Sequence, residues 1–165
     1  MASRAQEIRV GRIIACFAPG RAAAPEAVAH LAKQMQAELL GLFIEDAELL
    51  RFAALPFAAE VGLASAARRT LDLAAVERLL RGQAASVREA LAASLGGHHW
   101  SFRVARASPA DAVAAALAEG YAPSLVIPPG GNPLAERRIV RAADLDEEQL
   151  RALLAAVRPV LILPE

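Results

Sequence analysis

The stretch "VIPPGGNPLAERR", residues 126–138, holds the residues best suited to binding a phosphate group. A buried strand leads into a loop with two adjacent glycines, and the three prolines of the stretch have no amide hydrogen to donate. Gly130, Gly131 and Asn132 are therefore the local amide donors. A phosphate loop of the Gly-x-x-x-x-Gly-Lys-Ser/Thr kind also needs a lysine, and the only lysine of the chain is Lys33. The pattern favours a structural turn over a phosphate loop.

Arginines that follow this loop offer a second way to hold a phosphorylated ligand. Arg137, Arg138 and Arg141 could act as side-chain clamps, because a guanidinium group pairs bidentately with phosphate. The alternative is an exposed basic face that holds no ligand. We favour the basic face and keep the clamp as the alternative.

Two adjacent carboxylates, Glu45 and Asp46, end the apolar run "ELLGLFIED". At the C-terminal end of a parallel strand they could bind a hydroxyl group or a metal ion, or act as general acid and base. The alternative is that Asp46 caps a following helical segment while Glu45 is solvated. The sequence favours this structural role.

Few other residues are candidates for metal binding or nucleophilic chemistry. His98 and His99 are adjacent, so their side chains point apart in an extended segment, and His30 lies far away in the sequence. Cys16 sits in an apolar run, which favours a small core residue over a nucleophile, and no Gly-x-Ser-x-Gly elbow occurs. We therefore expect no metal site, no catalytic residues and no enzyme activity.

The composition limits the class of protein to which these residues belong. The 165 residues fit one domain, and the 18 basic and 18 acidic residues cancel, which removes a general attraction to nucleic acid or an anionic membrane. No stretch approaches the roughly 18 apolar residues of a membrane span, and a single cysteine suits a reducing compartment. We expect a single-domain cytoplasmic protein over residues 1–165, with no nucleic-acid partner and no membrane insertion.

Strands and helices that would position these residues alternate along the chain. Apolar or alternating runs predict five strands, at 10–17, 38–46, 100–106, 124–129 and 160–163. Helical spacing and capping signals predict four helices, which start at 25, 73, 108 and 146. This order predicts an α/β fold, a doubly wound five-stranded parallel sheet with helices on both faces and a ligand crevice at the strand C-termini.

The crossover at about 46–72 is longer than such a fold requires. Its large apolar residues either extend the core or form a hydrophobic lid or docking surface, and we favour the core. These residues are Leu49, Leu50, Phe52, Leu55 and Phe57.

The layout resembles that of the universal stress protein family over nearly the whole chain. The resemblance rests on "VGRIIACF", "AELLGLFIED", the long crossover, "WSFRVAR", "SLVIPPGG" and the final "RPVLILPE". It implies the strand order 3-2-1-4-5 and a homodimer paired through the fifth strand, whose apolar edge would otherwise be open to uncontrolled pairing. The implied interface residues are Val160, Leu161, Ile162 and Leu163.

The nucleotide motif of that family is altered in this chain. ATP-binding members carry an aspartate at the end of strand one and, after strand four, Gly-x-x-Gly, nine residues, then Gly and Ser or Thr. Here strand one ends in "CFAPGRAA", Gly130 and Gly131 are adjacent, and no Gly-Ser or Gly-Thr follows at that distance. The last helix opens with "DLDEEQ", in which Asp146 and Gln149 can form a capping box beside further carboxylates that repel phosphate.

From these residues we expect a non-catalytic, stress-associated regulatory or adaptor protein with no cofactor and a regulatory protein partner. One alternative is an ATP or AMP sensor with a degenerate loop, and another is a small-molecule enzyme that uses Glu45 and Asp46. The ligand-binding residues of the sensor would be Pro19, Gly20, Glu45, Gly130, Gly131, Asn132, Arg137 and Arg138.

Overall fold

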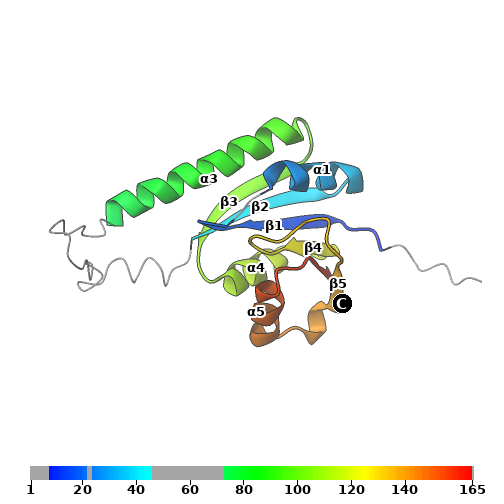
Figure 1. Cartoon of the computed structure of the whole chain (residues 1–165). Coiled ribbons are helices and arrows are strands. Elements are labelled where there is room, and N and C mark those ends of the chain that lie inside the picture. Colours follow the sequence, from blue (N-terminus) through cyan, green and yellow to red (C-terminus); the bar gives the residue numbers. More distant parts are fainter. Residues whose placement is uncertain (1–7, 22–23, 46–72, 165) are drawn as a thin grey trace, which may run out of the picture.

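The computed structural model describes residues 8–21, 24–45 and 73–164. These residues form one mixed sheet of six strands with helices on both faces (Figure 1). The crossover predicted at 46–72, with Asp46 and the five large apolar residues, lies outside the described residues. In the part of the chain that is described, no helix is both long and apolar enough to cross a membrane.

Three parallel strands form the first half of the sheet. β1 (Arg12–Phe17) pairs with β2 (Glu38–Glu45), and β2 pairs with β3 (Trp100–Arg106). β1 and β2 are buried over almost their whole length, which explains their continuous apolar sequence. β3 stands at the end of the strand order and consists of half-buried and exposed positions, so the prediction of an edge strand is confirmed.

Helices α1 (Pro25–Met35) and α3 (Leu73–Leu95) lie on one face of the sheet (Figure 1). The apolar residues of α3 recur every three or four positions, as predicted, and this stripe is buried against the strands. α3 ends before Gly96, whose φ of +54° is a left-handed conformation that glycine adopts without strain. The buried residues of the stripe are Leu80, Ala84, Val87, Leu91 and Leu95.

Helices α4 (Pro109–Leu117) and α5 (Glu147–Ala155) lie on the opposite face (Figure 1). α4 begins as its sequence predicts, because the Ser108 hydroxyl accepts a hydrogen bond from the Asp111 amide at 3.2 Å. β4 (Ser124–Ile127) then pairs with β1 in parallel. The predicted order is therefore confirmed through the first four strands, as β3-β2-β1-β4.

The predicted fifth strand, at 160–163, lies beside β4 as expected, but it runs antiparallel to β4 and is not the edge strand. An unpredicted strand, β5 (Arg138–Arg141), follows β4, and the chain then returns through α5 to β6 (Val160–Leu163). β6 pairs antiparallel with β4 and parallel with β5, so the complete order is β3-β2-β1-β4-β6-β5. No crossover helix separates β4 from β5, so β5 starts at the end of the sheet where β4 stops and runs back. The chain then returns through α5 to the end of the sheet where β5 began, so β6 runs parallel to β5.

In this order the strand that was predicted to form the dimer interface, β6, is an inner strand of the sheet. β6 lies between β4 and β5, and Val160, Leu161 and Ile162 are buried. The backbone groups that a second copy would pair with are therefore already used by β5. At this end of the sheet the edge strand is β5.

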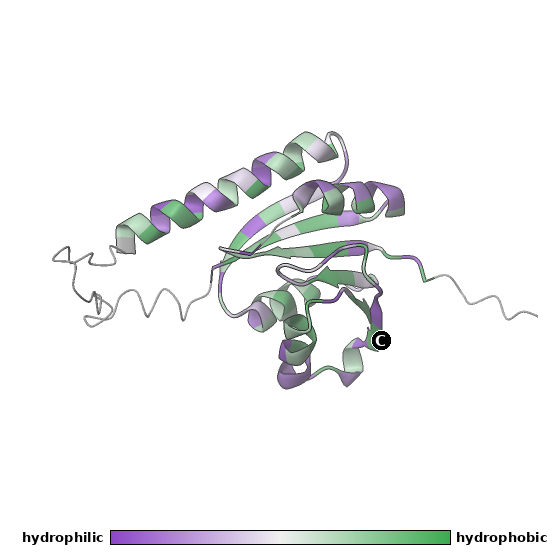
Figure 2. Ribbon diagram, viewed as in Figure 1, coloured by the Kyte–Doolittle hydropathy of each residue, from purple (hydrophilic) through white to green (hydrophobic). Residues whose placement is uncertain are grey.

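The apolar core is divided between the two faces of the sheet. Alternate residues of each inner strand point to α1 and α3 or to α4 and α5, which gives two clusters of buried side chains. Figure 2 shows the resulting hydrophobic strands between helices whose outer surfaces carry hydrophilic residues. The inner strands and their four covering helices hold the loops at the sheet ends in place.

Candidate functional site

The crevice at the C-terminal ends of β1 and β4 is the place where a fold of this kind holds a ligand. Among the described residues this crevice encloses only about 10 Å³. Arg21 contributes to its closure, because a Cβ atom placed on Gly130 would lie 3.6 Å from Arg21 Cδ. Sequence reasoning missed Arg21, whose place became visible only when the turns after β1 and β4 came together.

The glycines after β4 form a tight turn that closes on itself. The Gly131 amide donates to the Pro128 carbonyl at 2.9 Å, and Gly130 has a φ of +74°. The Asn132 side-chain oxygen accepts from the Leu134 amide at 3.0 Å, which is a local turn of the Asx type. Because the Gly131 amide already donates to a carbonyl of the same loop, the loop has the hydrogen bonding of a structural turn and not of a phosphate loop.

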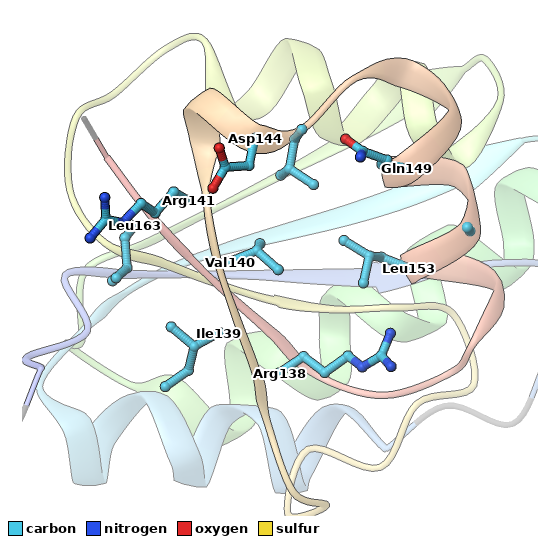
Figure 3. Close-up of a pocket in the computed structure, with 10 residues that line it drawn as sticks. Arg138, Ile139, Val140, Arg141, Asp144, Gln149, Leu153 and Leu163 are labelled. Atoms are coloured by element: carbon cyan, nitrogen blue, oxygen red, sulfur yellow. The ribbon is translucent and has the colours of Figure 1, made fainter.

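The remaining predicted ligand residues do not converge on one point. Pro19 and Gly20 lie in the turn after β1, where the Arg21 amide donates to the Ala18 carbonyl at 3.3 Å. Arg137 extends toward α1, with its Nη2 atom 3.9 Å from Met35 Sδ. Arg138, in contrast, lines a groove beside α5 (Figure 3). The structure thus brings the two glycine turns together, places Arg138 and Arg141 along one groove, and directs Arg137 toward α1.

Glu45 is buried instead of solvated, which corrects the sequence-based expectation for this residue. Its side chain accepts a hydrogen bond from Arg106 Nε at 2.9 Å, and Glu45 is only 4% exposed. Arg106 Nη2 also donates to Glu77 Oε1 at 3.1 Å, so one guanidinium connects β2 and β3 to α3. The hydrogen bond with Glu45 raises the pKa of Arg106 above its ordinary value. Glu45 was correctly placed at a strand end, but the partner that buries it is distant in sequence.

The first turn of α5 contains the predicted capping box. The Gln149 amide donates to Asp146 Oδ1 at 2.7 Å, and the Asp146 amide donates to Gln149 Oε1 at 3.0 Å. However, β5 runs antiparallel to β4, so α5 begins at the sheet end opposite to the crevice. The carboxylates of this turn therefore do not lie in front of the crevice, contrary to the expectation that they exclude phosphate from it.

Two larger hollows lie at the two edges of the sheet. One, of about 760 Å³, separates β5 from α5 and has an apolar floor that includes Val140 and Leu153, with Arg138, Asp144 and Gln149 around it (Figure 3). The other, of about 600 Å³, lies between α3 and the edge strand β3. Its lining residues are Glu45, Arg81, Ala84, Ala85, Arg88, Phe102, Arg103, Val104 and Arg106.

The groove beside β3 was not predicted, although the sequence contains a signal for it. Arg81 and Arg88 are seven residues apart on α3, and the small residues Ala84 and Ala85 lie between them. Residues at this spacing share a helix face, and small side chains leave room above a neighbouring strand. The strand beside these residues is β3. Only the order of the described strands shows that β3 lies at the edge of the sheet.

Cys16 and the histidines have structural surroundings. Burial raises the pKa of the Cys16 thiol to about 12, so the thiolate needed for nucleophilic attack is disfavoured. The Nε2 atom of His98 lies 2.6 Å from the Ala37 carbonyl oxygen, and His99 faces Glu38 at 4.0 Å. Within the described ranges, no three histidine, cysteine or acidic side chains form a group that could hold a metal ion.

Comparison with known proteins adds no family assignment. A scan against models of protein families finds no match, and a search of the curated proteins also finds none. The resemblance to universal stress proteins therefore stays a prediction that rests on the layout of the chain.

Proposed function

We propose that this protein is a non-catalytic regulatory or adaptor protein of the universal stress protein type, which acts through protein partners and without conventional ATP binding. The observation that carries the proposal is the turn after β4, which closes on itself through the hydrogen bond from the Gly131 amide to the Pro128 carbonyl. Among the described residues, the hollow between this turn and the turn after β1 measures about 10 Å³. Sites for drug-sized ligands usually measure about 300–1,000 Å³. Among the described residues, a nucleotide in this hollow would have to displace Arg21 and the turns that line it.

The surroundings of Glu45 also support a role without catalysis. A general base needs access to the proton that it abstracts, and Glu45 is buried beneath its ion pair with Arg106. This arrangement suits a carboxylate that joins strands. The enzyme alternative would need Glu45 to leave Arg106 during each turnover.

The test is a calorimetric titration of ligand-stripped protein with ATP, ADP and AMP, with and without magnesium. We expect no saturable heat in any condition. Saturable binding near one nucleotide per chain would overturn the proposal and favour the sensor. Arg21→Ala provides the matched variant, because removal of this side chain opens the crevice without altering its glycine turns. Binding by the variant alone would support closure by Arg21.

A cytoplasmic location and a homodimer belong to the same proposal, and the pairing strand is now β5. Ile139 is 59% exposed on this edge strand, whereas Leu161 is only 3% exposed in the core. Ile139→Arg should therefore halve the mass measured by light scattering without unfolding the chain. A wild-type protein that is monomeric at all concentrations would refute the dimer. Leu161→Arg is unsuitable for this test, because a buried charge would disrupt the core.

A further inference from the structure

Among the described residues no strand pairs with the outer edge of β3, and this edge, together with the groove beside α3, has the features of a peptide-binding site. We infer that an extended acidic segment of a partner protein binds there by adding a strand to β3. This inference rests on the proposed adaptor function and names the surface and the chemistry of the partner.

The backbone of β3 has one row of hydrogen-bonding groups directed away from the sheet. The Ala107 amide donates to the Glu45 carbonyl at 3.2 Å, and the His99 carbonyl accepts from the Leu39 amide at 3.3 Å. Successive residues of a strand direct these groups alternately to the two sides. The odd-numbered residues of β3 therefore face β2, and the even-numbered residues present amides and carbonyls at the edge. An added strand satisfies such a row.

The groove beside this edge leaves room for the side chains of an added strand. It measures about 600 Å³ and runs between α3 and β3. The small side chains of Ala84 and Ala85 belong to its lining on the α3 side, while Phe102 and Val104 provide apolar surface on β3. Val104 is 48% exposed, although its neighbours along the inner strands are buried. A strand placed here would cover this exposed apolar surface.

The charges in the groove favour an acidic occupant. Arg103 is held by two hydrogen bonds to Glu119, and Arg106 is held by carboxylates of β2 and α3. Arg81 and Arg88 also line the groove, and within the described residues neither forms an ion pair. Two arginines are therefore available to carboxylates of a partner, and such complementarity gives specificity.

The spacing of these two arginines suits an extended chain. Arg81 and Arg88 are seven positions apart, which corresponds to about 10.5 Å along α3. In a strand, side chains on one face recur about every 7 Å, so acidic residues at alternate positions can reach both guanidinium groups. A second copy of this chain would instead add its own β3, whose sequence WSFRVAR contains no carboxylate to pair with Arg81 and Arg88.

The experiment measures fluorescence anisotropy of a fluorescein-labelled peptide, TEVEVEVT, with the full-length chain at low salt. The peptide TKVKVKVT reverses the charge. The peptide TEPEPEPT keeps the charge, but it lacks three backbone amide hydrogens, and its prolines, with φ fixed at about −65°, disfavour a paired strand. We expect the first peptide to bind at least about tenfold more tightly than either control, and added salt to weaken it. Equal binding of the proline peptide would overturn strand addition.

Protein variants locate the site. Arg81→Glu with Arg88→Glu should weaken binding at least about tenfold, because it reverses the charge of the groove. Arg78→Glu with Arg151→Glu makes the same change of net charge outside the groove and should leave binding unchanged. Val104→Pro removes one outward amide and should abolish binding. Unchanged binding by the groove variants would overturn the inference.

Two outcomes separate this inference from the proposed function on which it rests. If TEVEVEVT does not bind and nucleotides also give no heat, the site assignment fails while the adaptor proposal stands. Saturable ATP binding overturns the adaptor proposal whatever the peptide does. If Val104→Pro converts a wild-type dimer into a monomer, a second copy occupies the edge and the peptide inference fails.

Discussion

Two proline substitutions in β3 test which of its backbone amides point away from the sheet and which bond to β2. Val104→Pro removes an amide hydrogen that points away from the sheet. Ala105→Pro, one residue later, removes an amide hydrogen that points into the ladder with β2. The two changes insert the same ring into the same strand, so the difference between their effects on stability reports the direction of the backbone groups.

The magnitudes follow from the groups that each substitution leaves unpaired. Ala105→Pro loses one ladder hydrogen bond, a net contribution of about 0.5–1.5 kcal/mol, and leaves a carbonyl of β2 without its donor, at about 1–3 kcal/mol. Val104→Pro breaks no hydrogen bond with β2 and leaves no carbonyl of β2 unpaired, and the Val104 side chain is already 48% exposed. Its cost is the restricted φ of proline and some apolar contact, about 1 kcal/mol. The free energies of unfolding should therefore differ by about 2 kcal/mol.

Urea unfolding followed by circular dichroism measures this difference directly. In a chain of this size, about 2 kcal/mol corresponds to about 4–8 °C in the melting temperature. Val104→Ala is the control for lost side-chain contact and should be close to Val104→Pro in stability. Equal destabilisation by the two prolines, or a larger effect at Val104, would refute the described register and the edge that depends on it.

Three further predictions concern single residues. Cys16 should resist iodoacetamide at pH 8 in the native protein and react after unfolding, because burial raises the thiol pKa to about 12. Mass spectrometry follows the labelling, and rapid labelling of the native protein would contradict this prediction. Gly41→Ala should destabilise the chain by about 1–3 kcal/mol in urea unfolding, because the new Cβ atom would lie 2.9 Å from Phe102 Cδ2. An unchanged urea midpoint would show that the Phe102 ring moves aside without cost. The hydrogen bond from Arg103 lowers the pKa of Glu119 below its ordinary 4.5, so the stability of wild type over Glu119→Gln should be present at neutral pH and decline as the pH falls below about 4.5. Urea midpoints between pH 7 and pH 3 test the sign, and a difference that grows in acid would contradict it.

The sequence predicted local features with a short-range cause. The continuous apolar runs of β1, β2 and β4 are typical of strands that are buried on both faces. The caps of α4 and α5 formed as expected, because Ser108, Asp146 and Gln149 bond to amides within three residues of themselves. Alternation in β3 correctly indicated an edge. In each case the interacting groups are neighbours in the chain.

The functional residues were predicted less completely, because their partners are distant in sequence. Glu45 was recognised as a strand-end carboxylate, but its burial depends on Arg106, which lies 61 residues away. Gly130 and Gly131 were recognised as a turn, but the small hollow beside them is lined by Arg21, which follows the neighbouring strand β1 and is distant in sequence. The groove beside β3 requires α3 to be placed over that strand. None of these juxtapositions has a local pattern.

The sequence by itself thus determined the α/β class, the first four strands and the ends of the helices, since periodicity and capping act within a few residues. Only the tertiary structure decided that β6 runs antiparallel to β4, that the four-residue strand Arg138–Arg141 covers it, and that the capped end of α5 lies away from the crevice. Strand direction and edge position depend on how the chain returns between strands, and a short basic strand has too little apolar periodicity to reveal that return.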